Sequence, residues 1–181
     1  MVFFTSDNHI GRKDDGAEAV ARWNETVGEN DTVYIAGDLF SHNVRDPLGY
    51  LEKLSGIKIL ILGNNDPFWI LKSGKAEASR YFASIRNDTV LTVGRHTVGI
   101  SHYPKKNVTT DVLICGHIHK ARKVSGYRDL MSTLSLNAGE MICGGAPVTF
   151  PELVRYNEEF YGRAFSDEDK ALFGEISGLL K

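Results

Sequence analysis

The sequence is poor in cysteine, has no excess of either charge, and contains no apolar run of membrane-spanning length. Its two cysteines, Cys115 and Cys143, do not indicate a disulfide framework, and Cys115 ends an apolar stretch as a small core residue would. The formal net charge is -2, so charge does not favour tight nucleic-acid binding. Without a run long enough to cross a bilayer, we expect no membrane partner.

The composition predicts one globular domain in the cytoplasm. The chain has 181 residues, of which 42% are hydrophobic and 24% charged, and this suffices for a sizeable core. No basic residues precede the first apolar residues, so residues 1–7 do not resemble a signal peptide. A short run with Lys120, Arg122 and Lys123 is either a local basic patch or a solvated turn, and we do not expect nucleic acid as the partner.

Hydrophobic runs bounded by glycine and polar residues predict short buried strands. In the first half of the chain these runs alternate with helical patterns, whereas strands dominate after residue 88, which together favours a layered α/β sandwich. The expected strands are 2–5, 32–36, 57–62, 89–93, 97–100, 112–115, 133–136 and 148–156, and in the last one Pro151 either interrupts the middle of the run or marks a bend. The expected helices are 14–27, 47–54 and one from Ser166 toward Leu180, while 67–85 is expected to be partly helical.

Five short polar segments stand where predicted strands end. They are DNH at 7–9, GD at 37–38, GNND at 63–66, SHYP at 101–104 and GHIH at 116–119. Because sites in open α/β sheets cluster at the carboxyl ends of strands, we expect one shared polar site. By contrast, His96 lies beside a turn and is expected to be exposed.

The side chains of these segments suit divalent metal ions. Carboxylates, neutral imidazoles and an amide oxygen together favour a borderline metal over Ca²⁺, which prefers oxygen ligands alone. Asp38 stands alone after its glycine and is the natural carboxylate to bridge two ions. Two ions about 3.5–4 Å apart can hold a bridging hydroxide and clamp a phosphoryl group. A site with two dications and few carboxylates should attract phosphate.

The ordered motifs D-x-H, G-D, G-N-x-D, an isolated His and G-H-x-H resemble the calcineurin-like metallophosphoesterase superfamily, in particular its small single-domain bacterial and phage members. The resemblance covers residues 2–156 and implies a four-layer αββα sandwich of two mixed β-sheets flanked by helices. We expect one domain over residues 1–157, with residues 158–181 as a helical extension packed on it. The resemblance implies two divalent ions, manganese foremost, with Fe, Ni, Co or Zn as alternatives. One ion is assigned to Asp7, His9, Asp38 and His119, and the second to Asp38, Asn64, His102 and His117.

One position departs from the family pattern. Asn65 stands where the family usually has a histidine that is taken as the general acid. An amide cannot deliver a proton at neutral pH, and general acid catalysis is typically worth ~10²–10⁴-fold. We therefore expect either substrates whose leaving group needs little protonation or another proton donor, for which His42 is the available histidine.

Two more residues are candidates for a catalytic role beside Asn65. Arg12 either reaches a phosphate oxygen with its planar guanidinium or is a solvated loop cation. Asp66 either orients the Asn65 segment or caps the following turn through its carboxylate.

The sequence thus predicts a dinuclear metal-dependent phosphoesterase that uses a metal-bridging hydroxide. We expect a small phosphorylated substrate, a phosphodiester or nucleotide rather than a simple monoester, and a monomer or homodimer. The alternative is a metal-binding protein-interaction scaffold, with catalysis weakened because Asn65 replaces the usual histidine.

Overall fold

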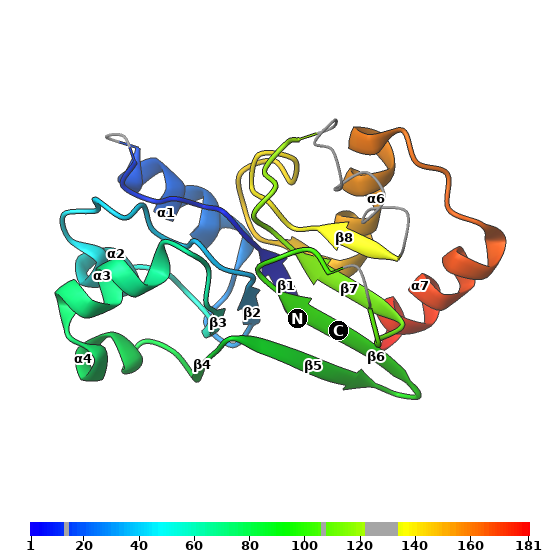
Figure 1. Cartoon of the computed structure of the whole chain (residues 1–181), viewed down its shortest axis with the longest axis horizontal. Coiled ribbons are helices and arrows are strands. Elements are labelled where there is room, and N and C mark those ends of the chain that lie inside the picture. Colours follow the sequence, from blue (N-terminus) through cyan, green and yellow to red (C-terminus); the bar gives the residue numbers. More distant parts are fainter. Residues whose placement is uncertain (13–14, 106–107, 122–133) are drawn as a thin grey trace.

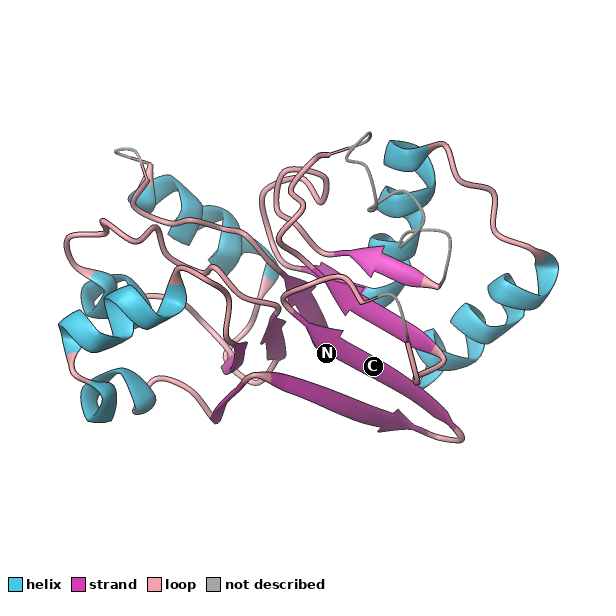
Figure 2. Cartoon of the chain, viewed as in Figure 1, coloured by secondary structure: helices cyan, strands magenta, loops and turns pink. Residues whose placement is uncertain are grey.

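The computed structural model describes residues 1–12, 15–105, 108–121 and 134–181. Two β-sheets pack together, with helices α1 to α4 on one side and α6 and α7 on the other (Figures 1 and 2). Both sheets mix parallel and antiparallel pairs. The predicted sandwich of two mixed sheets flanked by helices is therefore confirmed.

The first sheet has the strand order β4-β3-β2-β1-β9. Its strands are β1 (Val2–Thr5), β2 (Thr32–Ile35), β3 (Ile57–Ile61), β4 (Ser84–Arg86) and β9 (Val148–Thr149). Strands β1 to β4 are parallel, and parallel neighbours need crossover connections. Helices α1 (Gly16–Thr26), α2 (Pro47–Leu51), α3 (Asp66–Ser73) and α4 (Lys75–Ser79) lie in those connections.

The second sheet has the order β5-β6-β7-β8. Its strands are β5 (Asp88–Val93), β6 (His96–Ser101), β7 (Val112–Cys115) and β8 (Ser135–Asn137). A tight hairpin joins β5 to β6, and Gly94 adopts the positive φ of 62° that this turn requires. Of the strand expected over 133–136, residue 133 lies outside the described residues.

The prediction of a strand over 148–156 is wrong. Only β9 is extended, and the chain continues as α6 (Phe150–Tyr161). Thr149 and Glu152 form a capping box at its start, and Pro151 occupies the first turn, where its missing N–H costs nothing. The apolar residues Phe150 and Leu153 are one helical turn apart and buried on the same face. The expected boundary after residue 157 falls inside this helix.

The last predicted helix is confirmed as α7 (Asp167–Leu179), capped by Ser166. It covers the hairpin end of the second sheet, where Arg95 Nη2 and His96 Nε2 contact the Glu175 carboxylate at 3.0 and 2.8 Å. The expected exposure of His96 is therefore wrong, since its side chain is only 13% exposed. A tertiary contact from a distant helix covers it.

Strand β1 contributes to both hydrophobic cores because successive side chains point to opposite faces. Phe3 packs with the core beneath helices α1 to α4, which includes Trp23 and Trp69. Phe4 packs with the other core, which includes Ile114 of the second sheet and Phe173 of α7. Strands covered on both faces read as continuous apolar runs, and this is why the sequence revealed them.

Both cysteines are free and buried, and burial raises the pKa of each thiol to about 12. Among the helices within the described ranges, none combines the length and apolarity needed to span a bilayer.

Candidate metal centre

Five loops meet at the carboxyl ends of β1, β2, β3, β6 and β7. The Asp7 and His9 amides donate hydrogen bonds to the carbonyls of Gly37 and Asp38 at 3.0 and 3.1 Å, which binds the first two loops together. The structure thereby brings together all seven ligands expected from the sequence, namely Asp7, His9, Asp38, Asn64, His102, His117 and His119. Parallel strands end at the same edge of a sheet, so residues far apart in sequence become neighbours.

One group of candidate ligands consists of Asp7, His9 and His119, whose ligand atoms lie within 4.8 Å of one another. Asp7 Oδ1 lies 3.9 Å from His119 Nε2, and the rings of His9 and His119 stack. Within the described part of the chain, Asp7 Oδ1 and His9 Nε2 are buried and have no hydrogen-bond partner. Buried polar atoms are nearly always paired, so this group fits a cation that would satisfy both.

A second group consists of Asp7, Asp38 and His102, again within 4.8 Å. His102 Nε2 lies 3.7 Å from Asp38 Oδ2 and 3.2 Å from Asn64 Oδ1. His117 Nδ1 also faces Asn64 Oδ1, at 3.1 Å. The potential metal-binding atoms of Asp38, Asn64, His102 and His117 therefore lie close together, as the resemblance implies for a second ion.

The orientation of His102 is set by a hydrogen bond outside this group. Its Nδ1 lies 2.8 Å from the carbonyl oxygen of Ala36. A carbonyl can only accept, so Nδ1 donates to it, and Nε2 is thereby directed at Asp38 and Asn64. Histidine ligands of metals are commonly held in this way.

Both carboxylates face both groups. Asp38 Oδ2 lies 3.9 Å from His9 Nε2 and 3.7 Å from His102 Nε2, so Asp38 stands between the two sets of imidazoles. Asp7 belongs to both ligand groups, whereas the resemblance assigns only Asp38 to both ions. Asp7 Oδ2 is occupied by hydrogen bonds from the Ser6 hydroxyl and the His117 amide, each 2.8 Å long.

The backbone is strained at the candidate ligands. Among the described non-glycine residues, positive φ occurs only at Asp7, His9, Asp38, His117 and His119, with values of 55°, 43°, 56°, 70° and 47°. Such conformations cost about 1–3 kcal/mol each and persist where the surrounding structure imposes them. All five residues are candidate ligands. This indicates that the fold loses some stability where it brings these side chains together.

The motif glycines permit this close approach. A Cβ at Gly37 would collide with the His102 ring, and one at Gly116 with the side chains of Ser6 and Asp7. Any side chain at these positions would therefore displace a candidate ligand.

Burial lowers the pKa of His9 and that of His117, although the nearby carboxylates oppose the shift. Both imidazoles are consequently held in the neutral form, which is the form that binds metal.

Asp66 supports the ligand loops from the protein interior. Its fully buried carboxylate accepts hydrogen bonds from the amides of Asp38, Leu39 and Gly63 and from Trp69 Nε1, at 2.8 to 3.2 Å. Burial raises the pKa of this carboxyl, and the hydrogen bonds act in the opposite direction. The carboxylate is occupied by these donors and ties the β2 and β3 loops together, so Asp66 is a positioning residue.

We expect Asp66→Ala to lower the free energy of unfolding by about 3 kcal/mol or more, because three buried amides and an indole N–H would lose their acceptor. Urea denaturation followed by circular dichroism measures this. Asp167→Ala, at an exposed first-turn position of α7, is the control and should cost less than about 1 kcal/mol. Equal losses in the two variants would contradict the assigned role.

Beside the first ligand group lies an open hollow of about 460 Å³. It is lined by His9, Arg12, Ser41, His42, Asn43, Asn65 and His119. Asn65 donates from its backbone N and from Nδ2 to the two Asp38 carboxylate oxygens, at 2.8 and 2.5 Å. Arg12 and His42 thus share one space with candidate ligands, as a substrate-contacting role requires. Lys120 is exposed, and Arg122 and Lys123 lie outside the described residues.

Sequence reasoning missed several supporting residues. The Ser6 hydroxyl holds Asp7, and Ser41 and Asn43 line the hollow. Asn137 Nδ2 donates to the His119 carbonyl at 2.7 Å and so supports a ligand segment. Asn137 and His119 are far apart in sequence, so no local pattern pairs them.

Residues 1–150 match the family model of the calcineurin-like phosphoesterase superfamily domain. The chain therefore belongs to this superfamily, and the membership supports a metal-dependent phosphoesterase as its general class.

Two mycobacteriophage proteins are similar in sequence. The Gene 66 protein of phage D29 is 34% identical over 126 residues, which cover 57% of this chain and 63% of that protein. The Gene 66 protein of phage L5 is 32% identical over 171 residues, which cover 70% and 81%. A solved structure of a protein of unknown function from Aquifex aeolicus shares the fold, with a TM-score of 0.65 and 24% identity over 86% of this chain and 98% of that one.

Proposed function

We propose that this protein is a dinuclear metal-dependent phosphoesterase that prefers phosphodiester or nucleotide-type substrates. The observation that carries the proposal is the convergence of two ligand groups on the carboxylates of Asp7 and Asp38, with buried polar atoms of Asp7 and His9 left unpaired in the described structure. The ligand chemistry favours manganese, with Fe, Ni, Co or Zn as alternatives.

The first ion would be held by Asp7, His9, Asp38 and His119, and the second by Asp38, Asn64, His102 and His117. When bound, two such ions lower the pKa of water and polarise the phosphoryl group. The protein contributes the orientation of the ligands, and burial favours the neutral imidazoles of His9 and His117 by lowering their pKa. Arg12, on the adjoining hollow, would bind a non-bridging phosphoryl oxygen through its guanidinium.

The preference for diesters follows from Asn65. Its side-chain amide donates to Asp38 and cannot supply a proton to a departing alkoxide. Substrates with good leaving groups depend little on that proton. Among the described residues that line the hollow, His42 is the one histidine outside the ligand set, so we assign it as the alternative proton donor.

The proposal is tested by the hydrolysis of a bis-aryl phosphodiester and an aryl phosphomonoester, each with Mn²⁺ and after chelation. We expect faster turnover of the diester, lost on chelation and reduced by about 10²-fold or more in His117→Ala, because one ligand of the second ion is removed. His96→Ala is the matched control and should retain full activity, since His96 contacts Glu175 far from the site. Turnover that survives chelation would refute metal dependence, and faster turnover of the monoester would refute the diester preference.

The second candidate is a metal-binding scaffold for another protein. The absence of a histidine at position 65 favours it, as does the exposure of Phe68 and Leu71, which are 61% and 77% exposed on α3. Two equivalents of bound metal without turnover of either substrate would support this candidate over the first.

A further inference from the structure

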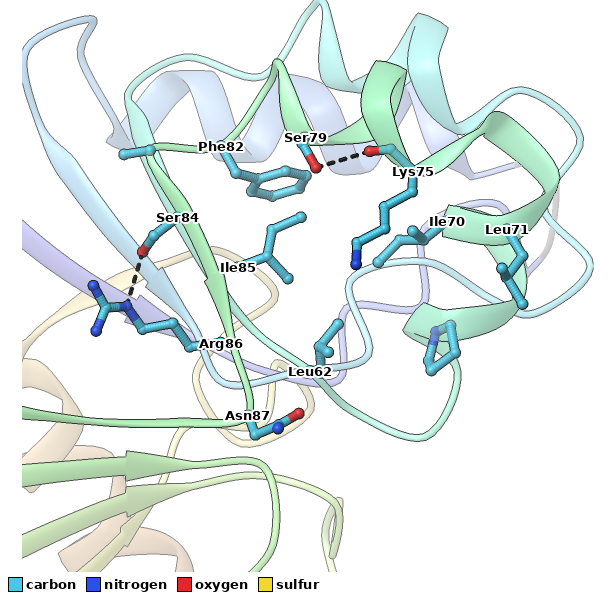
Figure 3. A pocket seen from close by; sticks show the side chains of 12 residues that line it. Leu62, Ile70, Leu71, Lys75, Ser79, Phe82, Ser84, Ile85, Arg86 and Asn87 are labelled. Atoms are coloured by element: carbon cyan, nitrogen blue, oxygen red, sulfur yellow. Dashed lines mark hydrogen bonds between the residues drawn. The ribbon is translucent and has the colours of Figure 1, made fainter.

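A second hollow lies beside the segment that joins β3 to α3, which contributes Leu62 to its wall. It has a volume of about 590 Å³ and is bounded by α3, α4 and the edge strand β4 (Figure 3). Its walls are mostly apolar, formed by Leu62, Pro67, Ile70, Leu71, Phe82 and Ile85. This volume is within the range of small-molecule pockets. None of the candidate metal ligands lines it, so it is a separate pocket.

One cation points into this pocket. Figure 3 shows the Lys75 side chain extending from α4 over the apolar wall, with its ammonium between Ile70 and Ile85. Among the described ion pairs Lys75 has no carboxylate partner, and the described lining residues include no acid. Lys75 is exposed, so its ammonium is accessible to the anionic group of a ligand whose apolar part contacts these walls.

The other lining cation does not share this position. Arg86 follows Ile85 in β4, and alternate side chains of a strand leave on opposite faces. In Figure 3 Ile85 enters the pocket while Arg86 points away from it, with its Nε 3.4 Å from Ser84 Oγ. Arg86 on β4 is therefore a control for Lys75 on α4, because it is a second cation whose charged group points away from the pocket.

We propose that this pocket binds a small organic anion, with its apolar body against Ile70, Phe82 and Ile85 and its anionic group on Lys75. The apolar walls disfavour a purely polar anion such as phosphate, and the ammonium disfavours an organic cation. Leu62 and Pro67 contribute to the walls and flank the segment that carries Asn64 and Asn65. The bound anion would therefore lie next to the candidate metal centre without entering it.

The probe is anilinonaphthalene sulfonate, which joins an apolar ring system to one sulfonate, and binding is followed by fluorescence. We expect saturation at one equivalent and affinity about tenfold weaker in Lys75→Glu. Phenylnaphthylamine has the same rings without the sulfonate, and its affinity should change by less than about twofold in that variant. Arg86→Glu should lower the affinity for the anionic probe by less than about threefold, because the guanidinium points away from the pocket.

Two apolar-wall variants test the location. Ile85→Asp should lower the affinity for both probes by about tenfold or more, because apolar contact is lost. Leu71→Asp serves the same purpose at a position that is 77% exposed, where folding is not at risk. Circular dichroism and thermal unfolding verify that each variant is folded.

Three results would overturn the proposal. The first is unchanged affinity in Lys75→Glu or in both wall variants. The second is loss of the probe in His117→Ala, which would place it at the metal centre. The third is a dimer in sedimentation that Ile85→Asp converts to a monomer, which would show that a second copy covers the pocket. Probe binding is measured without substrate turnover. Failure of the anion-binding proposal would therefore not affect the proposed phosphoesterase activity, and absence of that activity would not affect the anion-binding proposal.

Discussion

Replacing Asp38 by Asn is expected to reduce metal-dependent hydrolysis of an aryl phosphodiester by about 10³-fold or more. The Asp38 carboxylate is buried and faces imidazoles of both ligand groups, at 3.9 Å from His9 Nε2 and 3.7 Å from His102 Nε2. The neutral amide keeps the shape but removes the negative charge between the two proposed ions. Steady-state kinetics with Mn²⁺ and metal analysis of the purified protein measure the effect, and bound metal should fall from two equivalents to one or fewer.

Asp167→Asn is the matched control, because it makes the same chemical change at an exposed position in the first turn of α7. It should retain wild-type activity and metal content. If Asp38→Asn binds two equivalents and turns over the diester at the wild-type rate, Asp38 is not the shared ligand. Asp7, which belongs to both ligand groups, would then be the remaining carboxylate for that role.

Replacing Asn65 by His is expected to raise the hydrolysis of alkyl phosphodiesters by about 10²-fold, because an imidazolium can protonate the departing alkoxide. The site can accommodate the ring, since Asn65 borders an open hollow of about 460 Å³. For a nitrophenyl ester, whose leaving group needs no proton, the gain should be less than about threefold. The ratio of kcat/KM for the two substrates is the measurement.

Asn65→Gln is the control, since a longer amide still cannot deliver a proton. An equal gain on both substrates would contradict the general-acid argument. If the alkyl rate stays unchanged, another group already supplies the proton. In that case His42→Ala should lower the alkyl rate selectively, because His42 lines the same hollow.

Much of the fold was predictable because several of its strands, such as β7, are buried on both faces. Apolar runs such as 112–115 stand out from their polar surroundings, and aspartate and glycine mark the two ends of this run. The polar segments at these ends were equally visible, and their order along the chain carried the resemblance. The chemistry of the ligand set could therefore be inferred before any geometry was known.

The errors arose where local patterns were ambiguous. Residues 148–156 are rich in β-branched, aromatic and other apolar side chains, a composition that also favours a strand. The capping box of Thr149 and Glu152 favours a helix, and burial of Phe150 and Leu153 against the core supports it. His96 was expected to be exposed because the contact that covers it comes from Glu175, far along the chain.

By itself the sequence determined which chemical groups are available and at which strand ends they stand, because burial and turn formation act over a few residues. Only the tertiary structure decided how those groups are used. It brought together five loops that follow strands of both sheets, and it placed five of the seven candidate ligands in strained backbone. It also made Asp66 a buried acceptor for two of these loops. It also formed the pocket of Lys75 from helices and an edge strand that share no motif. Such arrangements depend on contacts between distant residues, and no local pattern records them.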